Sequence, residues 1–220
     1  MKVKEYLNSL ARVNGTTRLD AFSDGVFAII VTLLILEVKV PPLEKGFSNS
    51  DVLYALRETT PEFISFAFSF FVVAIYWVNH HHYMHLLDKT DWNVLWYNNH
   101  FLFWLCVIPF TTAFIGENPT QPIVVAVYAF VMMMSGLSFV MMGHHTFFRA
   151  PDLLKVNLPH DYKVKEFRRG YAGVGSYALA TVLALIYVKA SLVLLFLIPF
   201  AYFIPNLIQA NKEENEIEKS

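Results

Sequence analysis

Six apolar segments, each about 20 residues or longer, run along this chain of 220 residues. They are residues 20–40, 61–87, 92–116, 121–143, 170–188 and 190–208. About 20 apolar residues make one helical span of a bilayer, whose core offers no water to an unpaired backbone group. The composition agrees, because 16% of the residues are charged, whereas soluble domains carry about 25%. The sequence therefore predicts an all-α membrane protein with six transmembrane helices.

These segments also set the domain plan, because they leave little room for a separate soluble domain. We predict a cytoplasmic N-terminal segment at 1–19, a single six-helix transmembrane domain at 20–208 and a cytoplasmic tail at 209–220. Lys and Arg collect on the cytoplasmic side of membrane proteins. With both termini inside, the basic residues left in outer loops, out of 17 in the chain, are Lys39, Lys45, Arg57 and Lys189. This bias predicts that both termini are cytoplasmic.

Turn and breaker residues predict where the helices end. Pro41 and Pro42 stop the first helix, because proline has no N–H donor to continue it. Residues 116–121 form a short outer turn, and residues 146–168 form the longest inner loop, with room for a short surface helix. Cys106 is the only cysteine, so no intrachain disulfide forms.

Ionisable residues crowd the start of the first apolar segment, where Arg18, Asp20 and Asp24 surround Ser23. Charge at membrane depth is costly, and it marks either a pathway or a fixed internal contact. The candidate partners near the same ends of the helices are Arg18, Asn79, His80 and the indole of Trp77. We interpret Asp24 as a structural contact inside one subunit, and a proton or ion site is the alternative.

Helical periodicity separates two faces of the first helix, since positions three and four apart share a face. One face is the stripe of Gly25, Ile29, Thr32 and Leu36, flanked by Phe22 and Leu33, and the other holds Asp20, Ser23, Asp24 and Phe27. The stripe is typical of packing against a neighbouring helix through small residues. If symmetric copies meet around an axis instead, Ile29 and Leu36 form apolar rings and Thr32 lines the path between them. Periodicity leaves both interpretations open.

The first helix resembles a known channel signature. Arg18, Phe22, Ser23, Asp24 and Gly25 match the RxxxFSDG signature of the endosomal and lysosomal potassium channel family (transmembrane protein 175 type), in its bacterial and archaeal form. Trp77, Asn79, His80 and His81 match its W-x-N-H-H pattern, and Pro109, Phe110 and Thr112 match its P-F-x-T pattern. The similarity extends along the whole chain.

This resemblance implies a potassium-selective channel without a TVGYG filter, in which first helices line one central pore. The motif occurs once in this chain, so four copies are needed and a homotetramer is implied. The implied pore and selectivity residues are Ile29, Thr32 and Leu36, and the signature network is Arg18, Phe22, Ser23, Asp24, Trp77, Asn79 and His80. The expected partners are other copies of the chain, a prokaryotic plasma membrane and monovalent cations such as potassium, with no nucleic acid and no cofactor.

Histidines support a rival hypothesis. Six of the eight lie at inner helix ends: His80, His81, His82, His85, His144 and His145. Such clusters are similar to the histidine boxes of membrane di-iron oxidases, because imidazole binds iron and zinc. A metal-dependent membrane oxidase is therefore one alternative, and a pH-sensing or metal-sensing histidine cluster on a channel is a weaker variant. A secondary transporter is the third hypothesis, although repeats and interrupted helices, which are common in transporters, are not evident here.

Overall fold

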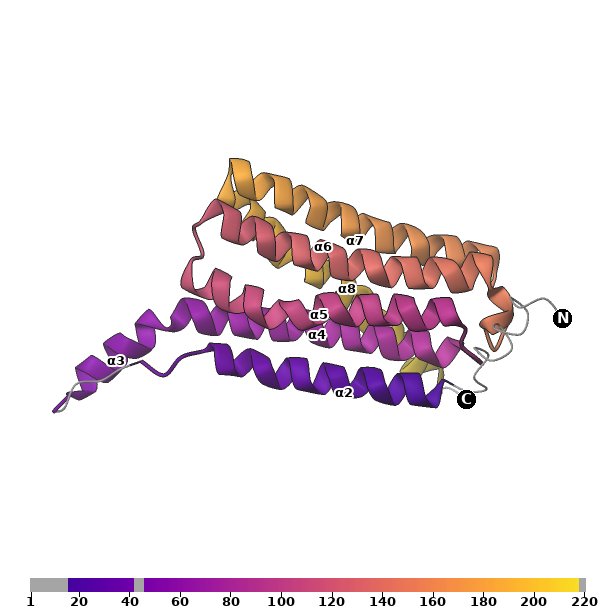
Figure 1. Ribbon diagram of the computed structural model, residues 1–220, viewed down its shortest axis with the longest axis horizontal. Helices are drawn as coiled ribbons and strands as arrows, with labels where there is room; N and C mark the ends of the chain where they lie inside the picture. The colour runs from indigo at the N-terminus through magenta and orange to yellow at the C-terminus, as the bar shows by residue number, and fades with distance from the viewer. Residues whose placement is uncertain (1–15, 42–45, 218–220) are drawn as a thin grey trace.

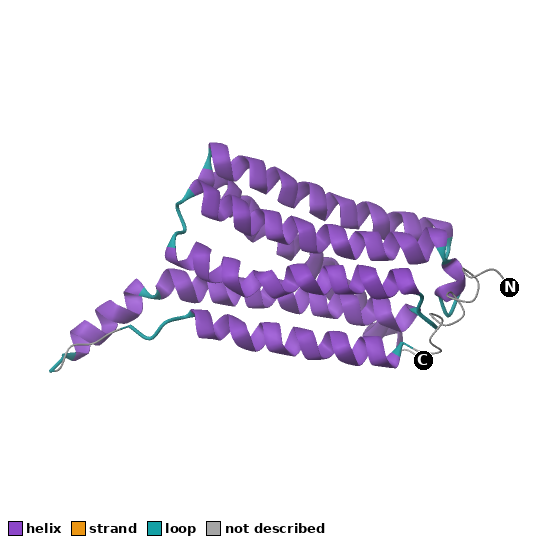
Figure 2. Ribbon diagram, viewed as in Figure 1, coloured by secondary structure: helices purple, strands orange, loops and turns teal. Residues whose placement is uncertain are grey.

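The computed structural model describes residues 16–41 and 46–217, with side chains described as far as Tyr202. Long helices lie side by side in one elongated bundle, and α3 projects from one end of it (Figure 1). The helices are α2 (Thr17–Leu34), α3 (Asn49–Glu58), α4 (Thr60–Leu86), α5 (Trp92–Glu117), α6 (Pro122–His144), α7 (His160–Ile186) and α8 (Val188–Ile217), with short turns η1 (Ile35–Glu37), η2 (His145–Arg149) and η3 (Pro151–Leu153). Figure 2 shows helix throughout, joined by short loops. The fold class is therefore all-α, as predicted.

Five helical stretches of the described chain are long and apolar enough to cross a membrane. They are Thr17–Glu37, Thr60–Leu86, Trp92–Glu117, Pro122–Arg149 and His160–Ile186. The described apolar part of α8, Val188–Tyr202, is shorter. Five of the predicted spans thus correspond to helices that could cross a membrane, and the sixth stays a prediction.

Two helix boundaries differ from the predicted ones. The first helix ends at Glu37, before Pro41, because the chain is already extended at Val38, with φ −83° and ψ 105°. In addition, α7 begins at His160 rather than 170, so the predicted inner loop 146–168 is too long. The first ten residues of α7 are rich in charge, so they lack the apolar run by which this segment is predicted. A prediction from hydropathy alone therefore finds the apolar part of α7 and misses its charged start.

The connection between α2 and α4 contains a helix, α3, that was not predicted. Its start is a capping box, in which the Ser48 side chain accepts from the Asp51 N–H and the Asp51 carboxylate accepts from the Ser48 N–H. These bonds lower the pKa of the Asp51 carboxyl, because they favour its charged form. The S-x-x-D pattern is a known helix-start signal, so this element was readable from the sequence.

The bundle core is centred on α5 and α6. In the most apolar stretch of each helix, 50% of the residues are buried in α5 and in α6, against 22% in α2. One side of α2 contributes Phe27, Ile30 and Leu34 to this core. The Phe27 and Phe101 rings lie 6.1 Å apart between centroids. These contacts attach α2 to α4 and α5 along one side.

A second hydrophobic cluster lies at the end of the bundle that holds the α4–α5 and α6–α7 connections. Its buried members are Tyr83, Met84, Leu87, Val94, Met142, Phe147, Leu153 and Leu154. The backbone N–H of Asp88 donates to the Leu153 carbonyl at 2.9 Å, and that of Lys155 donates to the Leu86 carbonyl at 2.9 Å. The two connections at this end are therefore held together by backbone hydrogen bonds as well as by apolar packing.

Candidate functional site

The stripe face of α2, which Leu36 of η1 continues, is not covered by the rest of the described chain. Ile29 is 59% exposed and Leu36 is 71% exposed, and Thr32 between them is also exposed. A methyl group added at Gly25 would meet nothing within 4 Å. Within the described part of one subunit this stripe therefore packs against no neighbouring helix, and Gly25 is not required for a close helix approach.

The Thr32 hydroxyl is oriented by its own helix. Its Oγ1 donates to the carbonyls of Ala28 at 3.0 Å and Ile29 at 2.9 Å, sharing one hydrogen between them. A hydroxyl has one donor and two acceptor lone pairs. The hydrogen is thus held toward the helix, and the oxygen lone pairs are left for a group that approaches the stripe.

The opposite face of α2 is bound to α4 and α5 through a chain of buried hydrogen bonds. Ser23 Oγ donates to the Leu19 carbonyl at 2.8 Å and accepts from Asn98 Nδ2 at 3.0 Å. Asn98 Oδ1 lies 2.8 Å from His80 Nε2. Because the single Ser23 hydrogen is used on Leu19, its oxygen must accept, which directs the Asn98 amide nitrogen to Ser23 and its oxygen to His80. His80 therefore donates through Nε2–H.

The acidic residues of α2 lie beside this chain of bonds. Asp24 Oδ1 accepts from the Trp77 indole Nε1 at 2.9 Å. Trp77 is 41% exposed, so this bond lies near the surface of the bundle. In the described part of the chain, Asp20 Oδ1 is buried without a hydrogen-bond partner, as is His80 Nδ1.

The structure brings together only part of the predicted signature network. Ser23 and His80 are joined through Asn98, and Asp24 is joined separately to Trp77. Arg18 is exposed, and no bond within the described chain joins it to the acidic residues. Phe22 is 56% exposed, and the half-buried side chain of Asn79 makes no hydrogen bond to described residues.

Asn98 is a functional candidate that the sequence reasoning missed. It is fully buried, at 0% exposure, and it is the only link between Ser23 and His80 in the bonds described above. A signal was present, because Asn98 lies within an apolar segment, where an amide is costly unless it finds partners. A polar side chain inside a predicted span therefore indicates a hydrogen-bond partner on a neighbouring helix.

The third-helix motif also forms an interhelical contact. Thr112 Oγ1 lies 2.8 Å from Ser69 Oγ and 2.8 Å from the Ile108 carbonyl. Ser69 Oγ lies 2.9 Å from Tyr128 Oη. This buried group joins α4, α5 and α6, whereas Phe110 of the same motif is 65% exposed.

The histidines do not converge on a metal site in the chain that the structure describes, because no group of three or more His, Cys, Asp or Glu side chains there is arranged to hold a metal ion. His145 Nε2 lies 2.9 Å from Asp91 Oδ2. The His81 and His85 rings lie against each other at a tilt, with centroids 4.3 Å apart. These contacts place the histidines in pairs with different partners, unlike a box of converging ligands.

The C-terminal end of α2 is tied to α4 and α5 by Lys39, which follows η1. Its Nζ bonds to Glu117 Oε1, and its backbone N–H donates to Glu62 Oε2 at 3.3 Å. The hydrogen bond to the Glu117 carboxylate raises the pKa of the Lys39 ammonium, since it favours the charged form. Both ends of α2 are thus held to the bundle.

A bundle of membrane-length helices, one of which is fixed along one side and uncovered along the other, defines a helical membrane protein. The sequence model described as "Endosomal/lysosomal potassium channel TMEM175" matches residues 18–109. A potassium channel of Chryseobacterium sp. (strain P1-3) is 33% identical over 199 residues, which is 90% of this chain and 98% of that protein. A potassium channel of Chamaesiphon minutus is 32% identical over 180 residues, 80% of this chain and 87% of that protein. The chain belongs to the TMEM175 family.

Solved structures agree with this assignment. The crystal structure of a lysosomal potassium-selective channel TMEM175 homolog from Chamaesiphon minutus is similar with a TM-score of 0.73 at 30% identity, covering 86% of this chain and 97% of that one. A variant of the potassium channel MtTMEM175, crystallised with a nanobody fusion protein, shares the fold, with a TM-score of 0.59 at 19% identity over 88% of this chain and 93% of that one. These neighbours are ion channels, which confirms that the chain is not an enzyme and removes the oxidase alternative.

Proposed function

We propose that the chain is the subunit of a potassium-permeable cation channel that conducts along the stripe face of α2. The observation that carries this proposal is the exposure of Ile29, Thr32 and Leu36 on a helix whose other side is packed against α4 and α5. The relatives with the longest matches above are named potassium channels. The sequence contains no TVGYG segment, so side chains, rather than a carbonyl filter of that type, supply selectivity.

Four copies of α2 around one axis form the pore. Each chain supplies the signature once, and homo-oligomers favour closed symmetry, so the assembly is a homotetramer. Each subunit has six spans, with α8 as the sixth, in a single membrane domain at 20–208. The segments 1–19 and 209–220 are cytoplasmic, and the membrane is the plasma membrane of a prokaryote.

Conduction and selectivity follow from the chemistry of the stripe. Rings of Ile29 and Leu36 narrow the path and gate it by dewetting. A cation that passes them sheds part of its hydration, which costs less for potassium than for sodium because its water is held less tightly. The Thr32 lone pairs, left free by the bonds to Ala28 and Ile29, replace some of the lost water oxygens.

The hydrogen bonds on the other face hold α2 at the distance that the pore requires. Ser23 and Asp24 connect α2 to Asn98 of α5 and Trp77 of α4, respectively. Interhelical hydrogen bonds of this kind are a principal means of fixing helix positions in a membrane. The signature motif thus has a positioning role, whereas the stripe contacts the ion. No cofactor and no nucleic acid takes part.

Cross-linking tests the assembly. Ile29→Cys in a Cys106→Ser background should form covalent dimers on mild oxidation, because α2 helices face each other across the axis. The control is Val193→Cys, which is as exposed (60%) but lies on α8. The particle should have four times the subunit mass of 25.3 kDa. A monomeric particle, or equal cross-linking of both variants, contradicts the proposal.

Flux measurements test the conduction path. Purified protein in liposomes, without added cofactor, should conduct potassium without saturation or a counter-ion, unlike a transporter. Thr32→Ala should reduce the preference for potassium over sodium, and Ile29→Asn should leave a wet, leaky pore. Thr32→Ser keeps the hydroxyl and should keep the preference. If neither Thr32→Ala nor Ile29→Asn alters flux, these residues do not line the pore.

A further inference from the structure

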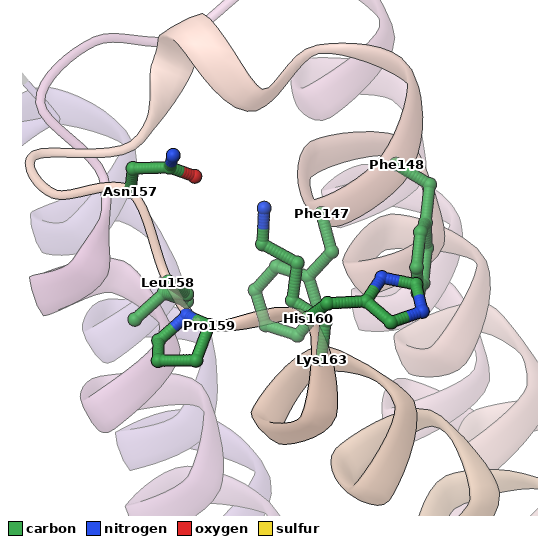
Figure 3. A pocket seen from close by; sticks show the side chains of 7 residues that line it. All are labelled: Phe147, Phe148, Asn157, Leu158, Pro159, His160 and Lys163. Carbon is green, nitrogen blue, oxygen red and sulfur yellow. The ribbon is translucent and has the colours of Figure 1, made fainter.

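A hollow of about 400 Å³ opens where the chain passes from α6 into α7, far along the sequence from the signature motif. Its lining residues are Phe147, Phe148, Asn157, Leu158, Pro159, His160 and Lys163. Figure 3 shows the Lys163 ammonium and the Asn157 carboxamide pointing into the same space, with the His160 ring beside Phe148. The volume is that of a small-ligand site, which is usually about 300–1,000 Å³.

Lys163 is the unusual member of this lining. It is 8% exposed, so it is more than nine-tenths buried, yet no carboxylate of the described chain lies within ion-pair distance of its Nζ. The Lys163 Nζ faces the hollow (Figure 3), and a positive charge held there without a carboxylate beside it attracts an anion. The site therefore has a charge that an anion would compensate.

The backbone adds to this positive potential. Lys163 lies in the first turn of α7, whose N-cap, Pro159, makes no side-chain capping bond. The first N–H groups of a helix lack intrahelical partners, and the helix dipole favours an anion there. The nearest acidic residue in sequence, Asp161, lines a different surface, together with Lys165 and Arg168. No acidic residue of the described chain lines the hollow itself.

We propose that this hollow binds a phosphate-bearing anion, with Lys163 as its counter-charge, Asn157 and His160 as hydrogen-bonding side chains and the first turn of α7 as a source of N–H donors. Two sources supply this chemistry. One is a soluble phosphate compound, and the other is a phospholipid headgroup, since the 27 residues of α7 span about 40 Å at 1.5 Å per residue, against a hydrocarbon core of about 30 Å. The bound anion would contact both the α6–α7 connection and the first turn of α7.

The first arm of the test uses soluble probes. Thermal unfolding of the purified full-length protein in detergent is followed while chloride is replaced by inorganic phosphate or pyrophosphate at constant ionic strength. Ligand binding to the folded state raises the unfolding temperature. The wild type and Lys165→Met, an exposed lysine on the same helix, should respond. In Lys163→Met the apparent Kd should weaken about tenfold, as expected for loss of one charge-assisted hydrogen bond.

The second arm tests the lipid source. The protein is incorporated into nanodiscs of phosphatidylcholine with or without phosphatidic acid, and retained lipid is measured by native mass spectrometry. A headgroup ligand predicts that the wild type and Lys165→Met retain phosphatidic acid, that Lys163→Met loses it, and that soluble phosphate has no effect. Two further variants cover a failure of Lys163→Met to fold: Lys163→Arg should keep binding and Asn157→Leu should weaken it.

Dependence on Lys163 decides whether the site exists. A response in either arm that depends on Lys163 and not on Lys165 supports the site and identifies its source. In buffer free of phosphate, Lys163→Met should unfold no lower than the wild type, because it keeps most of the apolar stem and breaks no ion pair within the described chain. No response of the wild type in either arm, or an equal response of Lys163→Met and Lys165→Met, overturns the proposal.

Discussion

The two sides of α2 carry similar apolar side chains but differ sharply in burial. On the inner side Ile30 and Leu34 are 1% and 0% exposed, whereas Ile29 and Leu36, one or two positions away, are 59% and 71% exposed. Hydrophobicity does not explain this, since all four side chains are large and apolar. What distinguishes the sides is the presence of partners: α4 and α5 supply hydroxyl, amide, imidazole and apolar groups to one side, and the described chain supplies nothing to the other. A helix built in this way is positioned by its inner side and exposes its outer side to something outside the subunit.

The largest expected effect lies on the packed side. Phe27→Ala should destabilise the subunit by about 3–5 kcal/mol, because Phe27 is 2% exposed and its ring contacts those of His80 and Phe101. The free energy of unfolding in mixed micelles measures this loss. Phe103→Ala, at 60% exposure on α5, is the matched control, with an expected change within about 0.5 kcal/mol. Similar losses in both variants would show that the distinction between packed and uncovered surfaces is wrong.

The next effect concerns the buried hydrogen bonds. Asn98→Leu should cost about 1–3 kcal/mol, because it leaves His80 Nε2 and Ser23 Oγ without the partner seen at 2.8 and 3.0 Å. Asn99→Leu changes the same residue type one position away on the exposed surface, and it should be nearly neutral. Unfolding measurements on the two variants in parallel test this. Equal stability of Asn98→Leu and the wild type would mean that the amide does not hold α2 in place.

A smaller effect is expected at the edge between the two sides. Trp77→Phe removes the indole donor to Asp24 at 2.9 Å while it keeps an aromatic ring. Because Trp77 is 41% exposed, water replaces part of the lost bond, and the cost should be about 1 kcal/mol or less. Indole N–H hydrogen exchange in the wild type provides an independent check, since the bonded Trp77 proton should exchange more slowly than that of the more exposed Trp92. Equal exchange rates would argue against the bond.

The smallest effect lies at the exposed end of α2. The pKa of Lys39 is raised above its ordinary value of 10.5 by its bond to Glu117. A raised folded-state pKa means that the contribution is fully present below the ordinary value and is lost as the pH rises through the raised one. Lys39→Gln should therefore lower the unfolding temperature slightly and equally from about pH 7 to 10, and the difference should shrink at higher pH. A difference that grows with pH would contradict the assigned ion pair.

The correspondence between sequence and structure is uneven along the chain, for physical reasons. The helical class and five spans followed from apolar length, because a bilayer permits little else. The start of α7 at His160 did not follow, since its first turns are rich in charge and carry no hydropathy signal. The two faces of α2 followed from periodicity. The role of Asn98 did not, because a helical wheel describes the faces of one helix at a time and cannot identify a partner 75 positions away along the chain.

The sequence by itself determined that the chain is helical, that it belongs in a membrane, and that the first helix carries an acidic and an apolar face, because these properties depend on local composition and on the 3.6-residue period. Only the tertiary structure decided which face is packed and which is left uncovered, which polar residues complete the buried hydrogen bonds, and that Lys163 lies in a hollow without a counter-charge from the described chain. These outcomes depend on which side chains the packed helices bring within a few ångströms of each other, and distance in space is not encoded by distance along the chain.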